Sequence, residues 1–153
     1  MQKNILALLL TLPVSLAINA SIVQEAPLVS IESHDSYFDN IRQLCGKAFE
    51  GKVVEDTPAS GGFNGRLVMH VRKCSDRQLQ IPFHVGDNHS RTWLITKTGS
   101  GLSLKHDHRN KDGSHDVSTM YGGHTTDAGW ANVQSFPADQ YSKELFSRLG
   151  NPQ

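Results

Sequence analysis

The sequence predicts a mainly β protein of the α+β class: an antiparallel meander that forms a curved sheet or a partial β-barrel, flanked by two amphipathic helices. Between residues 66 and 121, segments of alternating apolar and polar residues follow one another, separated by short turns rich in glycine, asparagine and aspartate. No helical pattern interrupts these segments, which favours antiparallel pairing over βαβ units. Helical spacing of apolar residues occurs only before and after them.

The first 20 residues have the features of a secretory signal peptide. Lys3 precedes an apolar run from Ile5 to Ile18, which contains a proline and is shorter than the roughly 20 apolar residues of a spanning helix. Small residues follow at signal-peptidase spacing. The mature chain is therefore expected to be periplasmic or secreted, with no membrane span. We expect a signal peptide over residues 1–20, a leader segment over 21–32 and a single β-rich domain over 33–150.

Charge and cysteine content narrow the classes of partner and compartment. Without Lys3 the chain has a formal charge of −1 and shows no basic stripe, which argues against nucleic acid as a partner. Cys45 and Cys74 are the two cysteines. In an oxidising compartment such an isolated pair predicts a disulfide, and the alternative is two unpaired buried thiols.

A first helix is predicted from Ser33 onward, where apolar residues recur at steps of three and four. Ser33 suits the N-cap and Asp35 the first turn, while Gly51 ends the pattern. Cys45 lies on the apolar side of this helix and is expected to point into the core. The residues of that side are Phe38, Ile41, Leu44, Cys45, Ala48 and Phe49.

Six strands are expected, at residues 52–55, 66–73, 78–85, 91–98, 101–108 and 117–121. In the third of them, Pro82 predicts an edge position or a bulge, because proline cannot donate to a ladder. The alternating residues Leu79, Ile81, Phe83 and Val85 are expected to be core.

A last helix is predicted to begin at Pro137 and to end before Gly150, which has the C′ position. Tyr141, Leu145 and Leu149 share one side of it.

The densest group of functional side chains is the histidine hairpin, residues 105–116, with three imidazoles, three carboxylates and an arginine near a turn signal. If Asp112 and Gly113 form a two-residue type I′ turn, Asn110 pairs with His115 and Arg109 with Asp116. Strand alternation then places His106 and His108 on the inward side with Leu102 and Leu104. The same register adds His115, Thr119 and Tyr121 to that side and turns Asp107 away from it.

Two histidines at positions i and i+2 of a strand can present both imidazoles to one divalent transition metal, with His115 as a third ligand. A second hypothesis is a pocket for a small polar ligand, lined by His106, His108, Thr119 and Tyr121. A third is a structural role, with the histidines hydrogen-bonded to Thr119, Tyr121 and backbone. His124 could reach the open end of the hairpin. A further polar group, from His84 to Arg91, straddles a turn, and we expect it to solvate that turn.

No catalytic template is present: there is no Gly-x-Ser-x-Gly elbow, phosphate loop or HExxH. We therefore expect a non-catalytic exported domain that binds a small polar ligand or a metal at the histidine hairpin. One alternative is a metal-dependent hydrolase with Asp107 or Asp116 as its base. Another is a cell-envelope interaction module.

Three segments carry a resemblance: IPFHVGDNHSRTW, GLSLKHDHRNKDG and TMYGG. With them the chain resembles a group of exported bacterial proteins for which no activity is established, over most of its length from Cys45 to Phe146. The resemblance implies an exported single-domain protein and assigns no catalytic residue. Members of that group extend beyond the last residue of this chain, which argues against a complete barrel.

Overall fold

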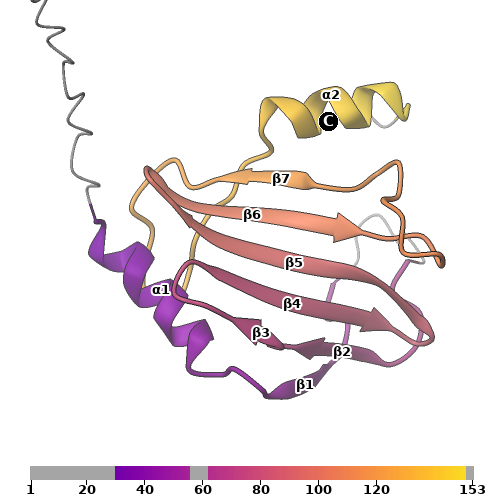
Figure 1. Ribbon diagram of the computed structural model, residues 1–153, viewed down its shortest axis with the longest axis horizontal. Helices are drawn as coiled ribbons and strands as arrows, with labels where there is room; N and C mark the ends of the chain where they lie inside the picture. Colours follow the sequence, from indigo (N-terminus) through magenta and orange to yellow (C-terminus); the bar gives the residue numbers. More distant parts are fainter. Residues whose placement is uncertain (1–29, 56–61, 151–153) are drawn as a thin grey trace, which may run out of the picture.

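A computed structural model describes residues 30–55 and 62–150. They form an antiparallel sheet of seven strands and two helices (Figure 1). The strands are ordered β1-β2-β4-β5-β6-β7, and β3 pairs with β4 beside β2. The predicted mainly β, antiparallel architecture is confirmed, and the sheet is open. The elements are α1 (Glu32–Arg42), β1 (Ala48–Gly51), β2 (Leu67–His70), β3 (Lys73–Cys74), β4 (Gln78–Val85), β5 (Asn88–Thr98), β6 (Gly101–His108), β7 (Tyr121–His124) and α2 (Gln140–Arg148). The predicted signal peptide lies outside the described residues.

The first helix is shorter than predicted. It begins after Ile31, whose side chain caps nothing, so Ser33 is not the N-cap but a residue of the first turn. It ends at Arg42, because Gly46 adopts a positive φ of 84° and its N–H donates to the carbonyl of Val71. The residues that follow pair with β2 as strand β1, so the prediction of a helix as far as Phe49 is wrong.

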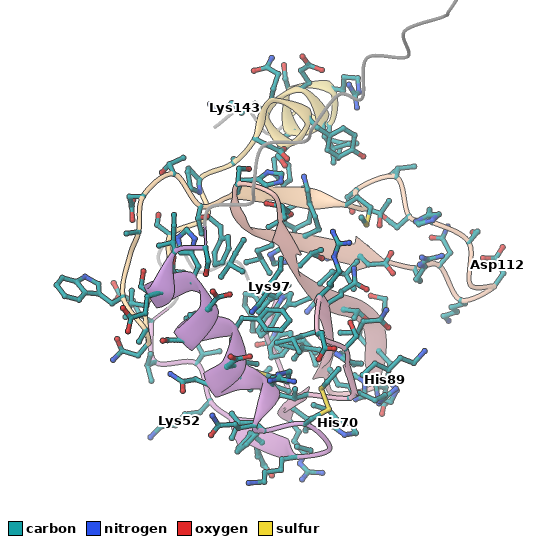
Figure 2. The ribbon with its side chains drawn as sticks, turned by 60° about the vertical axis from the view of Figure 1, so that its left-hand side comes forward. Lys52, His70, His89, Lys97, Asp112 and Lys143 are labelled. Atoms are coloured by element: carbon teal, nitrogen blue, oxygen red, sulfur yellow. A yellow bond between two sulfur atoms is a disulfide. The ribbon has the colours of Figure 1, made fainter. Side chains whose placement is uncertain are left out.

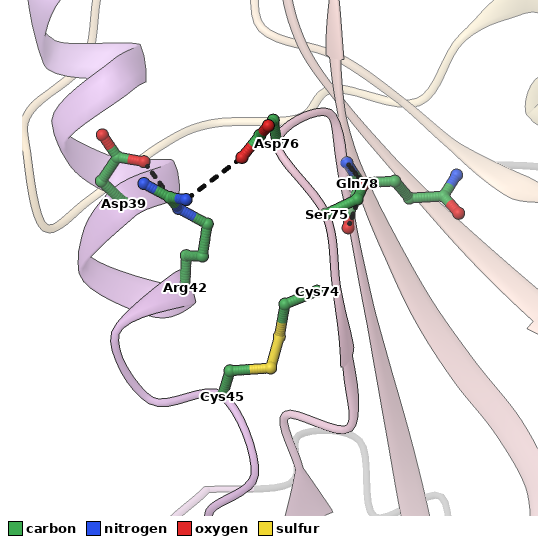
Figure 3. Close-up of a disulfide and its surroundings, with 7 residues drawn as sticks. All are labelled: Asp39, Arg42, Cys45, Cys74, Ser75, Asp76 and Gln78. Carbon is green, nitrogen blue, oxygen red and sulfur yellow. Dashed lines mark hydrogen bonds and ion pairs between the residues drawn. A yellow bond between two sulfur atoms is a disulfide. The ribbon is translucent and has the colours of Figure 1, made fainter.

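The predicted disulfide between Cys45 and Cys74 is confirmed, with a Cα–Cα distance of 6.3 Å (Figure 3). Cys45 lies in the turn after α1 and is exposed, so the expectation that it points into the core is wrong. Arg42 adds a second link between the same two regions, because its guanidinium pairs with both Asp39 and Asp76.

Two of the predicted strands, β4 and β6, have the expected bounds, whereas others differ. Residues 52–55 form no strand, and residues 66–73 divide into β2 and β3. The register with β4 changes by one residue between the pairs Met69–Phe83 and Lys73–Gln80. Pro82 pairs with Thr92 of β5, and on its other side it falls in the gap between the β2 and β3 ladders, so it lies in an interior strand beside an irregularity and not at an edge.

The core lies between α1 and one face of the sheet, which we call the inner face. Lys97 marks its border: its ammonium bonds the Asp35 carboxylate of α1 at 2.7 Å and lies 4.8 Å from the ring centre of Phe38 (Figure 2). Leu79, Ile81 and Val85 are buried as predicted, whereas Phe83 is only half-buried. The central cluster is Phe38, Val71, Leu79, Ile81, Ile95 and Leu102.

The C-terminal helix α2 runs beside β7 at the edge of the sheet (Figure 1). Its N-cap is Asp139, which accepts from the N–H of Ser142, so the helix starts later than predicted from Pro137. Leu145 is buried, but Tyr141 and Leu149 are exposed. Gly150 has the positive φ expected of a C′ residue. Neither α1 nor α2 has the length and apolar character that a transmembrane helix requires.

Candidate functional site

The histidine hairpin closes through a longer loop than predicted. The N–H of Asn110 donates to the carbonyl of Ser114, and Arg109 pairs with His115. The carboxylate of Asp112 accepts from both the N–H and the hydroxyl of Ser114, which stabilises this wider turn at the tip of the hairpin (Figure 2). The predicted pairs Asn110–His115 and Arg109–Asp116 are therefore wrong.

This register moves His115 to the outer face of the sheet. Its Nδ1 lies 3.6 Å from Oδ1 of Asp107, and Nε of Arg109 donates to both oxygens of the same carboxylate at 2.9 and 3.0 Å. Asp107 thus faces away from His106 and His108, as alternation predicts. His115 lies on the same outer face as Asp107. Within residues 30–55 and 62–150, no three His, Cys, Asp or Glu side chains are grouped so that they could hold a metal ion.

The return strand also begins later than predicted. Residues 117–120 form a turn in which Val117 is 77% exposed, and pairing with β6 resumes at Tyr121, opposite His106. The hydroxyl of Thr119 accepts from the backbone N–H of His108 at 2.9 Å and lies 3.2 Å from the Asp107 carboxylate. Thr119 therefore positions the hairpin backbone beside Asp107, and the predicted pairing of Thr119 with His106 on the inner side is wrong. His124 pairs with Ser103, at the end of β7 away from the hairpin, and is exposed.

His106 and His108 lie on the inner face, beyond the aliphatic core, in a continuous group of rings. The ring of His106 stacks on Tyr121 with 4.4 Å between centroids and makes a T-shaped contact with Trp93 at 6.2 Å between centroids. Trp93 stacks on Phe83 at 4.9 Å. We call this surface the aromatic face; its members are Phe83, Trp93, His106, His108 and Tyr121, with Phe63 and Phe146 at its two ends.

The aromatic face keeps its two imidazoles neutral near pH 7. Burial, followed by the charge of His108, lowers the pKa of His106 to about 4. Burial and the positive charge of Arg91 lower the pKa of His108, against the opposing charges of Asp116 and Asp107. Each neutral ring has one donor and one acceptor nitrogen available for contacts.

Arg91 is a further residue of this site. The sequence analysis placed it at the start of a strand, in a polar group expected to solvate the preceding turn, and not in the ligand site. Arg91 pairs with Phe83 on one side and with His108 on the other, and its guanidinium carbon lies 5.8 Å from the ring centre of Phe63. Nη1 of Arg91 and Nε2 of His108 are buried and have no hydrogen-bond partner among the described residues. Strand parity could have identified Arg91, because it shares its side of β5 with Trp93 and Ile95.

Two glycines and α2 hold Tyr121 in place. A Cβ atom on Gly122, whose φ is +146°, would lie 1.9 Å from the carbonyl oxygen of Leu104. One on Gly123 would lie 1.7 Å from the carbonyl oxygen of Pro137. The buried hydroxyl of Ser142 bonds the N–H and the carbonyl of Gly122 at 2.7 and 2.8 Å, which fixes α2 on β7.

A cavity of about 260 Å³ lies between α2 and the sheet, next to the aromatic face. Its lining is Leu104, His106, Tyr121, Gly122, Phe136, Ala138, Ser142 and Phe146. A larger hollow, of about 690 Å³, lies near the end of the hairpin, but every lining residue except Ser90 is exposed. It is lined by Asp87, Asn88, His89, Ser90, Arg109, Asn110 and Lys111.

In comparisons with known proteins, the chain matches no family model, no curated protein and no solved structure.

Proposed function

We propose that this protein is an exported, non-catalytic domain that binds a small polar ligand on the aromatic face. The observation that carries the proposal is the buried Nε2 of His108, which has no hydrogen-bond partner in the described part of the chain. An unpaired buried polar atom costs about 1–3 kcal/mol, and a bound ligand that pairs with it removes that cost. His106 and Tyr121 extend the ligand-contacting surface, and the curved sheet acts as a partial barrel around it.

Export to the periplasm or the exterior is part of the proposal. The disulfide is compatible with an oxidising compartment. The signal peptide expected over residues 1–20 supports the same location.

The arrangement favours an organic ligand over a transition metal or a metal-dependent hydrolase. On the aromatic face the side chains with metal-ligating nitrogens are His106 and His108, whose ring centroids are 6.4 Å apart. Asp107, one of the two carboxylates expected as a hydrolytic base, belongs to the outer face and is held by Arg109. A polar organic molecule needs neither a third protein ligand nor a nearby base.

The test is ring-nitrogen NMR of the histidines in isotope-labelled protein, with phenol, benzyl alcohol, phenylacetate and zinc chloride as probes. We expect an organic probe to shift the His106 and His108 signals in a saturable manner while those of His70, on the outer face, stay constant. The proposal is wrong if the organic probes shift no ring, or shift His70 equally. A response to zinc alone would overturn the organic ligand in favour of the metal.

A further inference from the structure

We infer that Arg91 and His108 together bind the carboxylate of a planar, aromatic carboxylic acid whose ring packs on the aromatic face. This inference rests on the proposed function and assigns a ligand class to the same site.

In the part of the chain that the structure describes, no carboxylate balances the charge of Arg91. Three other arginines have an acidic partner: Arg42 at 3.1 Å, Arg66 at 2.8 Å and Arg109 at 2.9 Å. Arg91 is half-buried, yet it forms no ion pair with an acidic side chain of residues 30–55 or 62–150. Partial desolvation of a guanidinium is unfavourable unless an anion is bound.

The two unpaired nitrogens are placed to serve one ligand group. Arg91 and His108 are direct cross-strand partners on β5 and β6, so their Cβ atoms are expected about 4.5–5.5 Å apart. Both Nη1 of Arg91 and Nε2 of His108 are buried on the same face. A guanidinium and a neutral imidazole N–H supply two donors, which match the two oxygens of a carboxylate.

The net charge of the pair favours a carboxylate over a phosphate monoester. Arg91 supplies one positive charge, and His108 is neutral near pH 7. A carboxylate carries one negative charge, whereas a phosphate monoester carries between about 1.5 and 2 at pH 7. A phosphate would therefore leave negative charge uncompensated in a half-buried site.

The surroundings of Arg91 explain why the rest of the ligand should be aromatic. Phe83 is the cross-strand partner of Arg91 on β4, and Phe63 lies next to the Arg91 guanidinium. Trp93 lies two residues further along β5, on the same side as Arg91. Phe63 is 43% exposed, so an apolar surface stands open beside the charged group. A planar ring can pack against these rings while its carboxylate reaches Arg91.

The experiment uses Trp93 as its reporter. The chain has two tryptophans, and Trp130 is 74% exposed on the loop before α2, so Trp130→Phe leaves Trp93 as the single tryptophan, which can be excited selectively over tyrosine. In this background the full mature protein is titrated with phenylacetate, with its neutral analogue benzyl alcohol and with phenyl phosphate. We expect phenylacetate to change the emission in a saturable manner and to bind at least about 10-fold more tightly than either analogue.

Arg91→Gln should weaken phenylacetate binding by about 10- to 100-fold and leave benzyl alcohol unchanged, since a charge-assisted hydrogen bond is lost. Arg77→Gln, at an exposed arginine of the turn before β4, is the matched control and should bind as the parent does. If Arg91→Gln does not fold, Arg91→Lys keeps the charge without the planar fork and should bind phenylacetate more weakly than the parent.

The failures are distinguishable. If benzyl alcohol binds as tightly as phenylacetate, or if Arg91→Gln or Arg91→Lys binds phenylacetate as well as the parent, the carboxylate assignment is wrong but the proposed function stands. Tighter binding of phenyl phosphate overturns the carboxylate in favour of another anion. If no organic probe shifts the rings of His106 and His108, both proposals fail. If the rings shift but phenylacetate leaves Trp93 emission unchanged, the carboxylate assignment is wrong and the proposed function stands.

Discussion

At the scale of single residues, the aromatic face places ionisable groups where the aliphatic core would otherwise continue. His106 stacks on the ring of Tyr121 and makes a T-shaped contact with Trp93, so ring packing and not a charged partner fixes its position. Burial disfavours the charged imidazolium. Its protonation state therefore depends on the packing of its neighbours.

We expect His106 to titrate near pH 4 in the folded protein, below the 6.5 of a free imidazole. The unfolded chain then binds a proton between about pH 6.5 and 4 that the native state does not. Stability from this group is complete above pH 6.5 and is lost as the pH falls through that window. Urea unfolding at several pH values should show a shallower decline for His106→Gln, and a His106 ring that titrates near 6.5 by NMR would contradict the prediction.

Strand parity identified part of the site because alternation needs only a continuous strand. It placed His106 and His108 on the inner face whatever the hairpin loop. Tyr121 also lies on the inner face, because His106 pairs with Tyr121 and not with Thr119 as predicted. This change of register by two residues, an even number, leaves each side chain of β7 on its predicted face. His115 changed face because its position depended on the hydrogen bonds between Asp112 and Ser114, which the two-residue turn signal did not reveal.

At the scale of elements, β7 is short but closely fitted between β6 and the segment before α2. It could not be predicted from alternation, because two of its four residues are glycines that present no side chain. Its position comes from close backbone approach at Gly122 and Gly123 and from the hydroxyl of Ser142. A glycine also explains why the length of the first helix was overestimated. The helical spacing of apolar residues continues past Arg42, but the backbone changes direction at Gly46.

Gly122→Ala should destabilise the protein by about 3 kcal/mol or more, since its Cβ would meet the backbone carbonyl of Leu104 and its φ is strained for alanine. Gly113→Ala is the control, because Gly113 also has a positive φ but has open space around its Cβ position, and it should cost only about 1–2 kcal/mol. Urea unfolding measures both. Equal losses for the two variants would show that β7 does not depend on this close approach.

At the scale of the whole molecule, the disulfide and the aromatic face have separate tasks. The disulfide joins the turn after α1 to β3, whereas the aromatic face is built on β4, β5, β6 and β7. Stability and binding can therefore be changed independently.

Replacement of Cys45 and Cys74 by alanine should lower the free energy of unfolding by about 3–4 kcal/mol, the chain-entropy estimate for a separation of 29 residues. Chemical denaturation of the double variant provides the measurement, and the parent protein under reducing conditions provides the comparison. In the Trp130→Phe background, the Trp93 response to phenylacetate should persist below the unfolding midpoint. A double variant as stable as the parent would show that the bond adds nothing to the stability of the fold.

The order of strands in the sheet also has a kinetic consequence. Every strand pair joins two strands that are consecutive in the chain or, for β2 and β4, separated only by the short strand β3, so contact order within the sheet is low and few large loops must close. The β5–β6 hairpin has only Gly99 and Ser100 between its paired ends, and it aligns Arg91 with His108 without help from α2. During folding we therefore expect the side chains of Arg91 and His108 to come together early, in the local β5–β6 hairpin. Helix α2 should pack against β7 last.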